Sequence, residues 1–460
     1  MNRTASKPRK GDLASNLRHG PPELKTGGLP PPPATCGPLG VFGKGHSTTH
    51  SAGSVTTAPA PRGLSLILAA TLAGGLTWSS LAEPFRPSSP DTVLIRLPRF
   101  FNLTAPSPGF SPGSLSSTTV PQPPADVAQA VATTRQLVLA ARRTADPRLL
   151  SRARLQLHPW WTATQAPTEV ILLRAEIRQG LHDFPAALAD IELALRNDPR
   201  HPGAWLLKAT LHQVRGDYDA ARGACLQLAR FADELIAVTA TVALRGLTDP
   251  SSASAVLLEK TLRTHPEADP AIRAWAFTTL GEVRSRHGDP TAAEAAFRSA
   301  LELEPAHPYT LAVLADLLID HGRATEVRVL LRDATAESLL LRLAEARFRT
   351  APNAPETQMA IEELSDSFAI AARRGDELHL REHSRFALRL GNDAAGALRL
   401  ARRNWEIQKE PADLEILLEA ARRTGDTQTL SDARSWAQRH QPAVLAQGKL
   451  RTAIHETPTR

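Results

Sequence analysis

The sequence of 460 residues is long enough for two or three ordinary domains, and 42% of its residues are hydrophobic while only 5% are aromatic. The formal net charge of +7 comes almost entirely from residues 1–62, where lysine and arginine far outnumber aspartate and glutamate. Because the remaining chain is nearly neutral, the basic balance does not indicate a nucleic-acid-binding protein.

Residues 1–61 are rich in proline, glycine, serine and threonine and show no periodic apolar pattern. Such a segment cannot bury enough apolar surface to offset the entropy lost on ordering, so a disordered basic leader is predicted. Cys36 lies in this leader, before the apolar run that follows, and is not placed for the lipid attachment of a bacterial lipoprotein.

A short apolar run, Leu64–Leu76, follows Arg62. A basic residue, a short apolar stretch and small residues up to Ala82 are typical of a secretory signal peptide, so residues 62–82 are predicted to direct export with cleavage after Ala82. Extended to Ala82, the run comes near the ~20 residues of a spanning helix, so an uncleaved anchor is the alternative. Usage rich in alanine, arginine and leucine with few lysines fits a bacterial gene. We therefore expect a periplasmic or secreted protein, or one anchored in the inner membrane.

Residues 83–124 are again rich in proline and serine, which predicts a linker. They contain a formal match to the G-x-S-x-G nucleophile motif at Gly109–Gly113. That motif works at a strand-to-helix turn of an α/β sheet, and Pro112 and the linker composition exclude such a setting. No other spacing of nucleophile, histidine and carboxylate stands out, so we predict no catalytic residue and no cofactor. A hydrolase or a metal-dependent enzyme is the least favoured alternative.

His379 and His383 have the spacing of metal ligands, because they lie four residues apart on a predicted helix. No third ligand accompanies them at a fixed spacing, and Arg381 and Arg385 border them. We predict no metal site and interpret the two histidines as part of a solvated helix face.

The helical part begins near Ala125, where apolar and small residues start to recur at helical spacing. The clearest unit, Ala274–His307, carries two apolar stripes separated by a turn at Gly288 and Asp289. Gly281 lies where a neighbouring backbone is expected to approach closely. Units with similar offsets begin at Thr168, Pro202, Pro308 and Pro411, and weaker copies fill the intervals.

The pattern of the clearest unit consists of Phe277, Leu280, Gly281, Gly288, Ala293, Phe297, Ala300 and Pro305. In these residues the segment resembles a tetratricopeptide repeat, although Arg284 stands where that family usually has an aromatic residue. The resemblance implies an all-α fold, a right-handed superhelical solenoid of antiparallel helix pairs over residues 125–440, followed by a C-terminal tail at 441–460. Each unit is expected to pack on its sequence neighbours alone.

The resemblance also implies a concave groove, lined by fixed positions of the first helices, that binds an extended peptide or a partner helix. Leu206, Trp275 and Tyr309 are the expected anchors. The lining lacks the lysines and asparagines with which one class of these proteins clamps a C-terminal carboxylate, so a chaperone-tail receptor is not expected. The predicted groove residues are Glu169, Leu172, Glu176, Gln179, Leu206, Thr210, Gln213, Trp275, Thr278, Glu282, Tyr309 and Asp316.

We therefore predict a non-enzymatic scaffold or adaptor of the cell envelope that binds a protein partner through this groove. Nucleic acid is not an expected partner, and membrane contact is expected only if residues 64–82 remain as an anchor. The alternative is a membrane-tethered assembly factor in which that anchor is kept.

Overall fold

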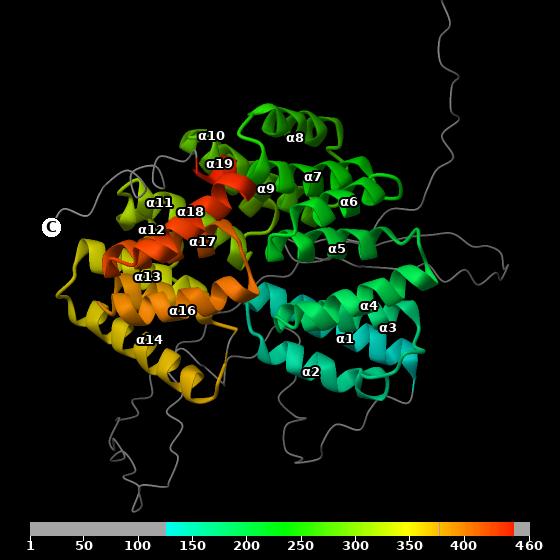
Figure 1. The fold of residues 1–460 in the computed structure, drawn as a ribbon, viewed down its shortest axis with the longest axis horizontal. Helices are drawn as coiled ribbons and strands as arrows, with labels where there is room; N and C mark the ends of the chain where they lie inside the picture. The colour runs from blue at the N-terminus through cyan, green and yellow to red at the C-terminus, as the bar shows by residue number, and fades with distance from the viewer. Residues whose placement is uncertain (1–125, 377, 446–460) are drawn as a thin grey trace, which may run out of the picture. The chain divides into compact units, whose positions relative to one another are not determined.

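The computed structural model describes residues 126–376 and 378–445, and the regular structure in these ranges is entirely helical (Figure 1). The predicted leader, signal segment and linker lie outside the described residues, as does most of the predicted tail. None of the described helices combines the length and the apolar composition that crossing a membrane requires. The predicted all-α fold of antiparallel helix pairs is confirmed.

The helices pair in chain order, each first helix with the helix that follows it. The pairs are α1 (Val127–Thr144) with α2 (Arg148–Gln156), α3 (Thr168–Gly180) with α4 (Phe184–Asn197), α5 (Pro202–Arg215) with α6 (Tyr218–Leu228), α7 (Glu234–Thr248) with α8 (Ala253–Thr264), α9 (Pro270–Arg286) with α10 (Pro290–Leu303), α11 (Pro308–Asp320) with α12 (Ala324–Leu330), α13 (Glu337–Thr350) with α14 (Pro355–Arg373), α15 (Leu380–Arg389) with α16 (Ala394–Ile407), and α17 (Pro411–Thr424) with α18 (Thr427–His440), before the short α19 (Pro442–Leu445).

The turns between helices follow from local sequence signals. At the turn inside the clearest unit, Gly288 has φ 75°, a left-handed conformation that glycine adopts without a steric penalty. The Asp289 side chain then accepts the Ala292 N–H at 3.0 Å and caps α10, and Pro290 stands at the first helical position. At the next junction, His307 Nδ1 accepts the Thr310 N–H at 3.3 Å and caps α11 in the same way.

The close contact inside the α9–α10 pair involves a ring. A Cβ atom on Gly281 would lie 2.5 Å from Cε1 of Phe297, whose side chain is 2% exposed. The glycine was expected to admit a neighbouring backbone, and this detail was wrong because the phenylalanine of the second helix fills the space. A large and a small residue therefore interlock within this pair.

The unit that begins at Pro308 departs from the pattern of the clearest unit. Its second helix, α12, ends at Leu330, and a turn closed by the bond from Ala334 N–H to the Leu331 carbonyl, 3.0 Å, replaces the expected helical turn. Leu331 and Ala334 occupy the offsets that Phe297 and Ala300 hold on α10, and they lie in this turn and not on a helix. The following first helix, α13, begins at Glu337, so the unit is shorter than its neighbours.

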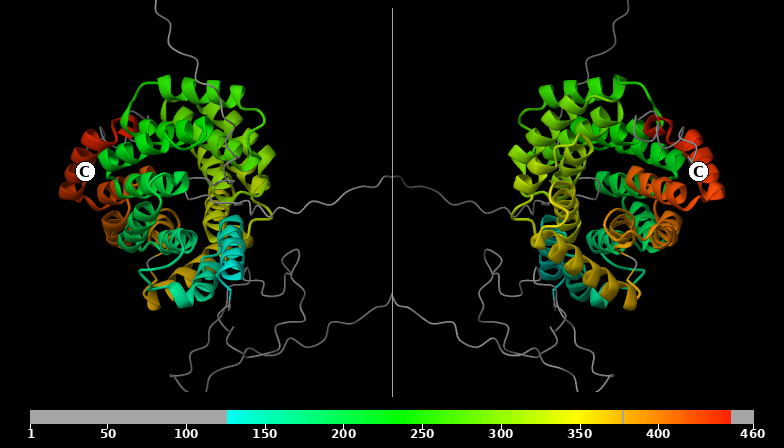
Figure 2. Two further views of the ribbon diagram at one scale, coloured as in Figure 1. Left: turned by 90° about the vertical axis from the view of Figure 1, so that its right-hand side faces the viewer. Right: turned by 90° about the vertical axis from the view of Figure 1, so that its left-hand side faces the viewer.

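Packing is not confined to neighbouring repeats, contrary to the prediction. One core cluster contains Leu206 of α5 and Trp275 of α9 together with Leu414 and Leu417 of α17. The Lys409 N–H, between α16 and α17, donates to the Val214 carbonyl of α5 at 2.7 Å. Both views of Figure 2 show the red C-terminal helices beside the green helices of α5 to α7. Repeats far apart in sequence therefore share one core.

The fit of Phe297 against Gly281 gives the first prediction. Gly281→Ala places a methyl group against a buried ring that cannot move freely, so we expect a loss of about 1–3 kcal/mol in the free energy of unfolding. The matched control is Gly223→Ala on α6, where a Cβ meets nothing within 4 Å, and we expect it to gain about 0.5–1 kcal/mol from helix propensity. Urea denaturation followed by circular dichroism measures both, and equal stability of the two variants would contradict the interpretation.

Candidate functional site

The structure buries half of the predicted groove. Leu172, Glu176, Gln179, Leu206, Trp275 and Thr278 are at most 6% exposed, so they pack inside the array and are not displayed on an open surface. Leu206 and Trp275 belong to the core cluster that also contains residues of α17, so their side chains lie in the interior of the array. Thr210, Gln213, Glu282, Tyr309 and Asp316 are half-buried and Glu169 is exposed, and for these residues the binding role stays a prediction.

Most of the charged groove residues form hydrogen bonds or ion pairs that connect one first helix to another. Glu176 of α3 accepts from Arg142 of α1 at 2.8 Å, and the Tyr309 hydroxyl of α11 donates to Glu282 of α9 at 2.6 Å. Burial raises the pKa of both glutamates, against the lowering effect of nearby arginines. These side chains already have partners within the array, so a ligand would have to compete with them.

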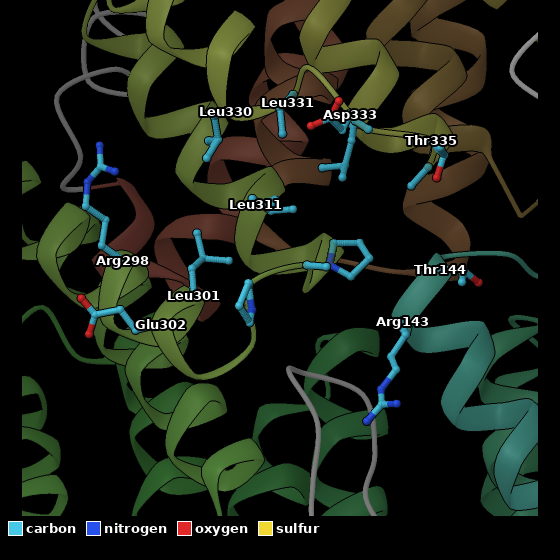
Figure 3. A pocket seen from close by; sticks show the side chains of 16 residues that line it. Arg143, Thr144, Arg298, Leu301, Glu302, Leu311, Leu330, Leu331, Asp333 and Thr335 are labelled. Atoms are coloured by element: carbon cyan, nitrogen blue, oxygen red, sulfur yellow. The ribbon is translucent and has the colours of Figure 1, made fainter. Parts of the chain in front are cut away.

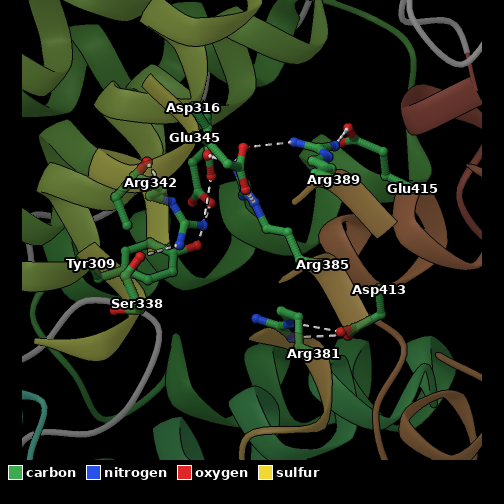
Figure 4. Close-up of polar contacts among 12 residues, drawn as sticks. Tyr309, Asp316, Ser338, Arg342, Glu345, Arg381, Arg385, Arg389, Asp413 and Glu415 are labelled. Atoms are coloured by element: carbon green, nitrogen blue, oxygen red, sulfur yellow. Dashed lines mark hydrogen bonds and ion pairs between the residues drawn. The ribbon is translucent and has the colours of Figure 1, made fainter. Parts of the chain in front are cut away.

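The most extensive network of ion pairs between first helices is centred on Arg385 of α15 (Figure 4). Its guanidinium binds both carboxylate oxygens of Glu345 on α13, at 2.5 and 2.9 Å, and reaches Asp316 of α11 at 2.7 Å. Burial alone would raise the pKa of Asp316, but Arg342 and Arg385 outweigh it and hold that pKa well below its ordinary value. Arg389 continues the network to Glu415 of α17 at 2.9 Å. The network thus joins α11, α13, α15 and α17 through paired charges, which is a structural role.

The histidine pair does not lie on a solvated face, so that interpretation was wrong. His379 is the N-cap residue of α15, and its Nδ1 atom lies 3.1 Å from Oε1 of Glu337. His383 stacks on Phe368 with ring centroids 4.9 Å apart and planes 6° apart. In the described ranges, no three His, Cys, Asp or Glu residues are gathered so as to hold a metal ion.

An accessible cavity of about 630 Å³ opens on another part of the array, and we call it the α11 cavity (Figure 3). It lies between the end of α1, the end of α10, the start of α11, the turn after α12 and the start of α13. Half-buried Leu301, Leu311 and Leu330 supply accessible apolar surface. Its lining residues are Arg143, Thr144, Arg298, Leu301, Glu302, Pro305, Ala306, Pro308, Leu311, Leu330, Leu331, Asp333, Ala334, Thr335, Ala336 and Leu339.

The rim of the α11 cavity carries charges of both signs. Arg298 forms an ion pair with Glu294, with Nη2 and Oε1 2.6 Å apart. Asp333 forms one with Arg332, with Oδ2 and Nε 3.1 Å apart. Arg143 and Glu302 are exposed, and neither makes a hydrogen bond or an ion pair with any other described residue. Figure 3 shows these two side chains apart from one another, with Leu301 and Leu311 between them in this view. An apolar floor with a charged rim is the usual anatomy of a protein-binding surface.

Two features explain why the sequence analysis did not predict the α11 cavity. The early end of α12 leaves space that a longer second helix would fill, yet Leu331 and Ala334 match the repeat offsets and so concealed the break. Arg143 and Thr144 come from α1, far away along the chain, and nothing in a local pattern links α1 to α11. Arg332 and Asp333 give no signal of the turn, because the matching residues of the clearest unit, Arg298 and Ser299, are polar as well and lie on the helix α10.

Comparisons with known proteins find similarity to one repeat family and to several solved structures. Residues 286–348, which include most of the cavity lining, match the family model described as tetratricopeptide repeat. No curated protein matches the chain in sequence. Solved structures with a similar fold include PilW, described as a widely conserved type IV pilus biogenesis factor, at 16% identity with a TM-score of 0.31, covering 62% of this chain and 98% of that one.

Two further solved structures are similar at the level of fold. The APC/C hetero-tetramer Cut9–Hcn1 matches at 14% identity and a TM-score of 0.42, covering 72% of this chain and 64% of that one. Yeast Tom70 matches at 12% identity and a TM-score of 0.32, covering 71% of this chain and 92% of that one.

The contact between His379 and Glu337 predicts a pH dependence of stability. Burial lowers the pKa of His379, but the hydrogen bond and charge of Glu337 outweigh it and raise this pKa to about 9. In the unfolded chain the pKa is about 6.5, so the folded state binds the extra proton between these values and stability falls as pH rises through them. The contribution of His379 to the free energy of unfolding is complete below the pKa of the unfolded chain and absent above the pKa of the folded state.

We therefore expect the free energy of unfolding of the wild type to exceed that of His379→Gln by ~1–3 kcal/mol near pH 6, and this excess to vanish near pH 9.5. Urea denaturation across that range measures the difference, which isolates His379 from other titrating groups. Glu337→Gln should remove the same pH dependence. An excess that stays constant with pH would contradict the proposed contact.

The Arg385 network predicts a large effect of a single substitution. Arg385→Met leaves Glu345, which is 2% exposed, without its main partner, so we expect a loss of about 3–5 kcal/mol in the free energy of unfolding. The matched control, Arg332→Met, breaks the solvent-exposed pair with Asp333 and should cost less than about 0.5 kcal/mol. A similar small loss for both variants would show that the buried network does not stabilise the fold.

Proposed function

We propose that this protein, whose residues 286–348 match the tetratricopeptide repeat model, is a non-enzymatic binding protein whose α11 cavity receives an apolar segment of a protein partner. The observation that carries the proposal is the cavity itself: about 630 Å³, within the range of small binding sites, with accessible leucines between charges of opposite sign. Its location at the junction of α1 with α10 to α13 lets one partner segment contact several repeats.

The chemistry of the lining supports binding rather than catalysis. Its polar side chains are two threonines and the charged residues Arg143, Arg298, Glu302 and Asp333, and the lining contains no histidine, cysteine, serine or lysine. A nucleophile with an adjacent general base, which acyl-transfer and hydrolytic sites need, is absent from this lining. The exposed and half-buried members of the predicted groove, Tyr309 and Glu282 among them, are kept as a secondary contact surface.

We further propose that the protein acts outside the cytoplasm, as a scaffold or adaptor of the cell envelope. The support is the predicted signal segment at residues 62–82, which lies outside the described residues. A membrane-tethered assembly factor is the second candidate, favoured if the same segment is kept. Cell fractionation with N-terminal sequencing separates them, because a released chain beginning at Glu83 fits export with cleavage and a membrane-bound chain that retains residues 64–82 fits the tether.

The cavity proposal predicts that Leu330→Glu prevents partner binding, because a carboxylate on the apolar floor would be desolvated when a partner docks. We expect a loss of about tenfold or more in the amount of partner recovered by affinity capture from the native envelope fraction. Val329→Glu is the matched control, since Val329 is the adjacent residue, is 65% exposed and does not line the cavity. Equal recovery with both variants, when both give the wild-type helical spectrum, would refute the assignment.

A further inference from the structure

An apolar run of the sequence remains outside the described residues. Residues 93–103, V-L-I-R-L-P-R-F-F-N-L, interrupt a linker that is otherwise rich in proline and serine, and we call them the apolar linker segment. Seven of these eleven residues are large and apolar, two are arginines, and none is acidic. The linker sequence on either side offers no apolar stripe on which the segment could pack. Burial of the segment therefore requires an apolar surface elsewhere in the protein.

The α11 cavity supplies such a surface. Leu301, Leu311 and Leu330 line it and are only half-buried, and exposed Pro305 extends the apolar lining. Contact with another apolar side chain removes these groups and the incoming side chain from water together, which is favourable in proportion to the area covered. The cavity and the apolar linker segment are therefore matched in polarity.

The carboxylates at the rim of the α11 cavity favour a basic occupant. Glu302 is exposed and forms no hydrogen bond or ion pair with another described residue, and Asp333 pairs with its sequence neighbour Arg332 in a contact that is itself exposed to solvent. Arg143 lies apart from Glu302 in Figure 3, and its charge acts on Glu304: burial raises the pKa of that glutamate, and Arg143 lowers it. The two arginines of the segment, with no acidic residue among them, thus complement the carboxylates of the rim.

The path of the chain allows the segment to reach the cavity. Helix α1 begins at Val127, and the cavity lies at its other end, beside Arg143 and Thr144. The 18 residues of α1 make a helix about 27 Å long. Residues 104–125 form a tether of 22 residues, which spans up to about 70 Å when extended. The tether is therefore long enough to carry the segment along α1 to the cavity.

We propose that the apolar linker segment occupies the α11 cavity of its own chain, with its apolar side chains against Leu301, Leu311 and Leu330 and its arginines at the carboxylates of the rim. This inference rests on the proposed function of the cavity and adds a regulation of it. The segment follows Ala82 in the chain, so the predicted cleavage would retain it, as would an uncleaved anchor. Both forms of the protein therefore contain an internal competitor for the cavity.

An attached occupant changes what a partner must do. The tether holds the segment at an effective concentration on the order of millimolar, so even a weak contact keeps the cavity occupied for much of the time. A partner then binds with an affinity reduced in proportion to the fraction of molecules whose cavity is empty. Only a partner that fits the cavity better than the segment does therefore displaces it.

The experiment places a photo-cross-linking side chain in the full-length protein at Phe100 of the segment. We expect Phe100→benzoylphenylalanine to form intramolecular cross-links within residues 298–311 and 330–339, mapped by mass spectrometry. The matched control, Phe110→benzoylphenylalanine, lies on the same linker and closer to α1 but outside the segment. We expect the Phe100 yield to exceed the Phe110 yield by about fivefold or more, since the tether alone gives both positions comparable access.

Charge reversal tests the rim contacts without any change in the repeats. Arg96→Glu combined with Arg99→Glu is expected to lower the Phe100 yield about threefold or more, because the new carboxylates would face the carboxylates of the rim. Arg86→Glu, a reversal on the same linker outside the segment, should leave the yield unchanged.

Equal yields at Phe100 and Phe110, cross-links outside the cavity, or cross-linked dimers in place of monomers would overturn the proposal. The cavity itself is tested separately by Leu330→Glu in the capture experiment. If that variant loses the partner while Phe100 does not reach the cavity, only the occupant is wrong. If Phe100 reaches the cavity while Leu330→Glu captures the partner as well as Val329→Glu does, only the partner site is wrong.

Discussion

A helix pair cannot bury its apolar stripe alone, and this constraint determines how the whole array packs. Within a pair, Phe297 fills the space above Gly281, and between pairs the charges around Arg385 join consecutive first helices. Apolar surface is also buried between distant repeats. There, hydrogen bonds of Lys409 and Gln441 hold the C-terminal helices against α5 to α7. Half of the predicted groove residues are buried within the protein itself.

The sequence predicted what depends on neighbouring residues. The turn at Gly288, the cap at Asp289 and the stripe of Ala293 and Phe297 are all encoded within one unit, so the helix pairs and the repeat class could be predicted. It did not predict the burial of Leu206 and Trp275, because they belong to a core to which helices far away along the chain, α17 among them, also contribute. A repeat offset describes a position on a helix, and exposure at that position depends on which other helices reach it.

The charged positions on the first helices show the same limit of prediction from sequence. Glu176 and Asp316 occupy positions that line a groove by analogy, and their charge suggested a polar binding surface. In the structure each one meets an arginine of another pair, Arg142 or Arg385, and each carboxylate is engaged. An acidic residue on a first helix can therefore either pair with an arginine of another repeat or contact a ligand. Which of the two occurs depends on whether the stacking of the repeats brings an arginine next to it.

The α11 cavity differs from the predicted groove in how it can be used. It is open at the surface, and Arg143 of α1 lies at the rim of a site built mainly from α10 to α13. The groove residues Glu176, Glu282 and Asp316 are already paired with side chains of other helices, so a ligand there would have to displace those partners. The cavity instead offers accessible apolar surface, because its leucines Leu301, Leu311 and Leu330 are only half-buried.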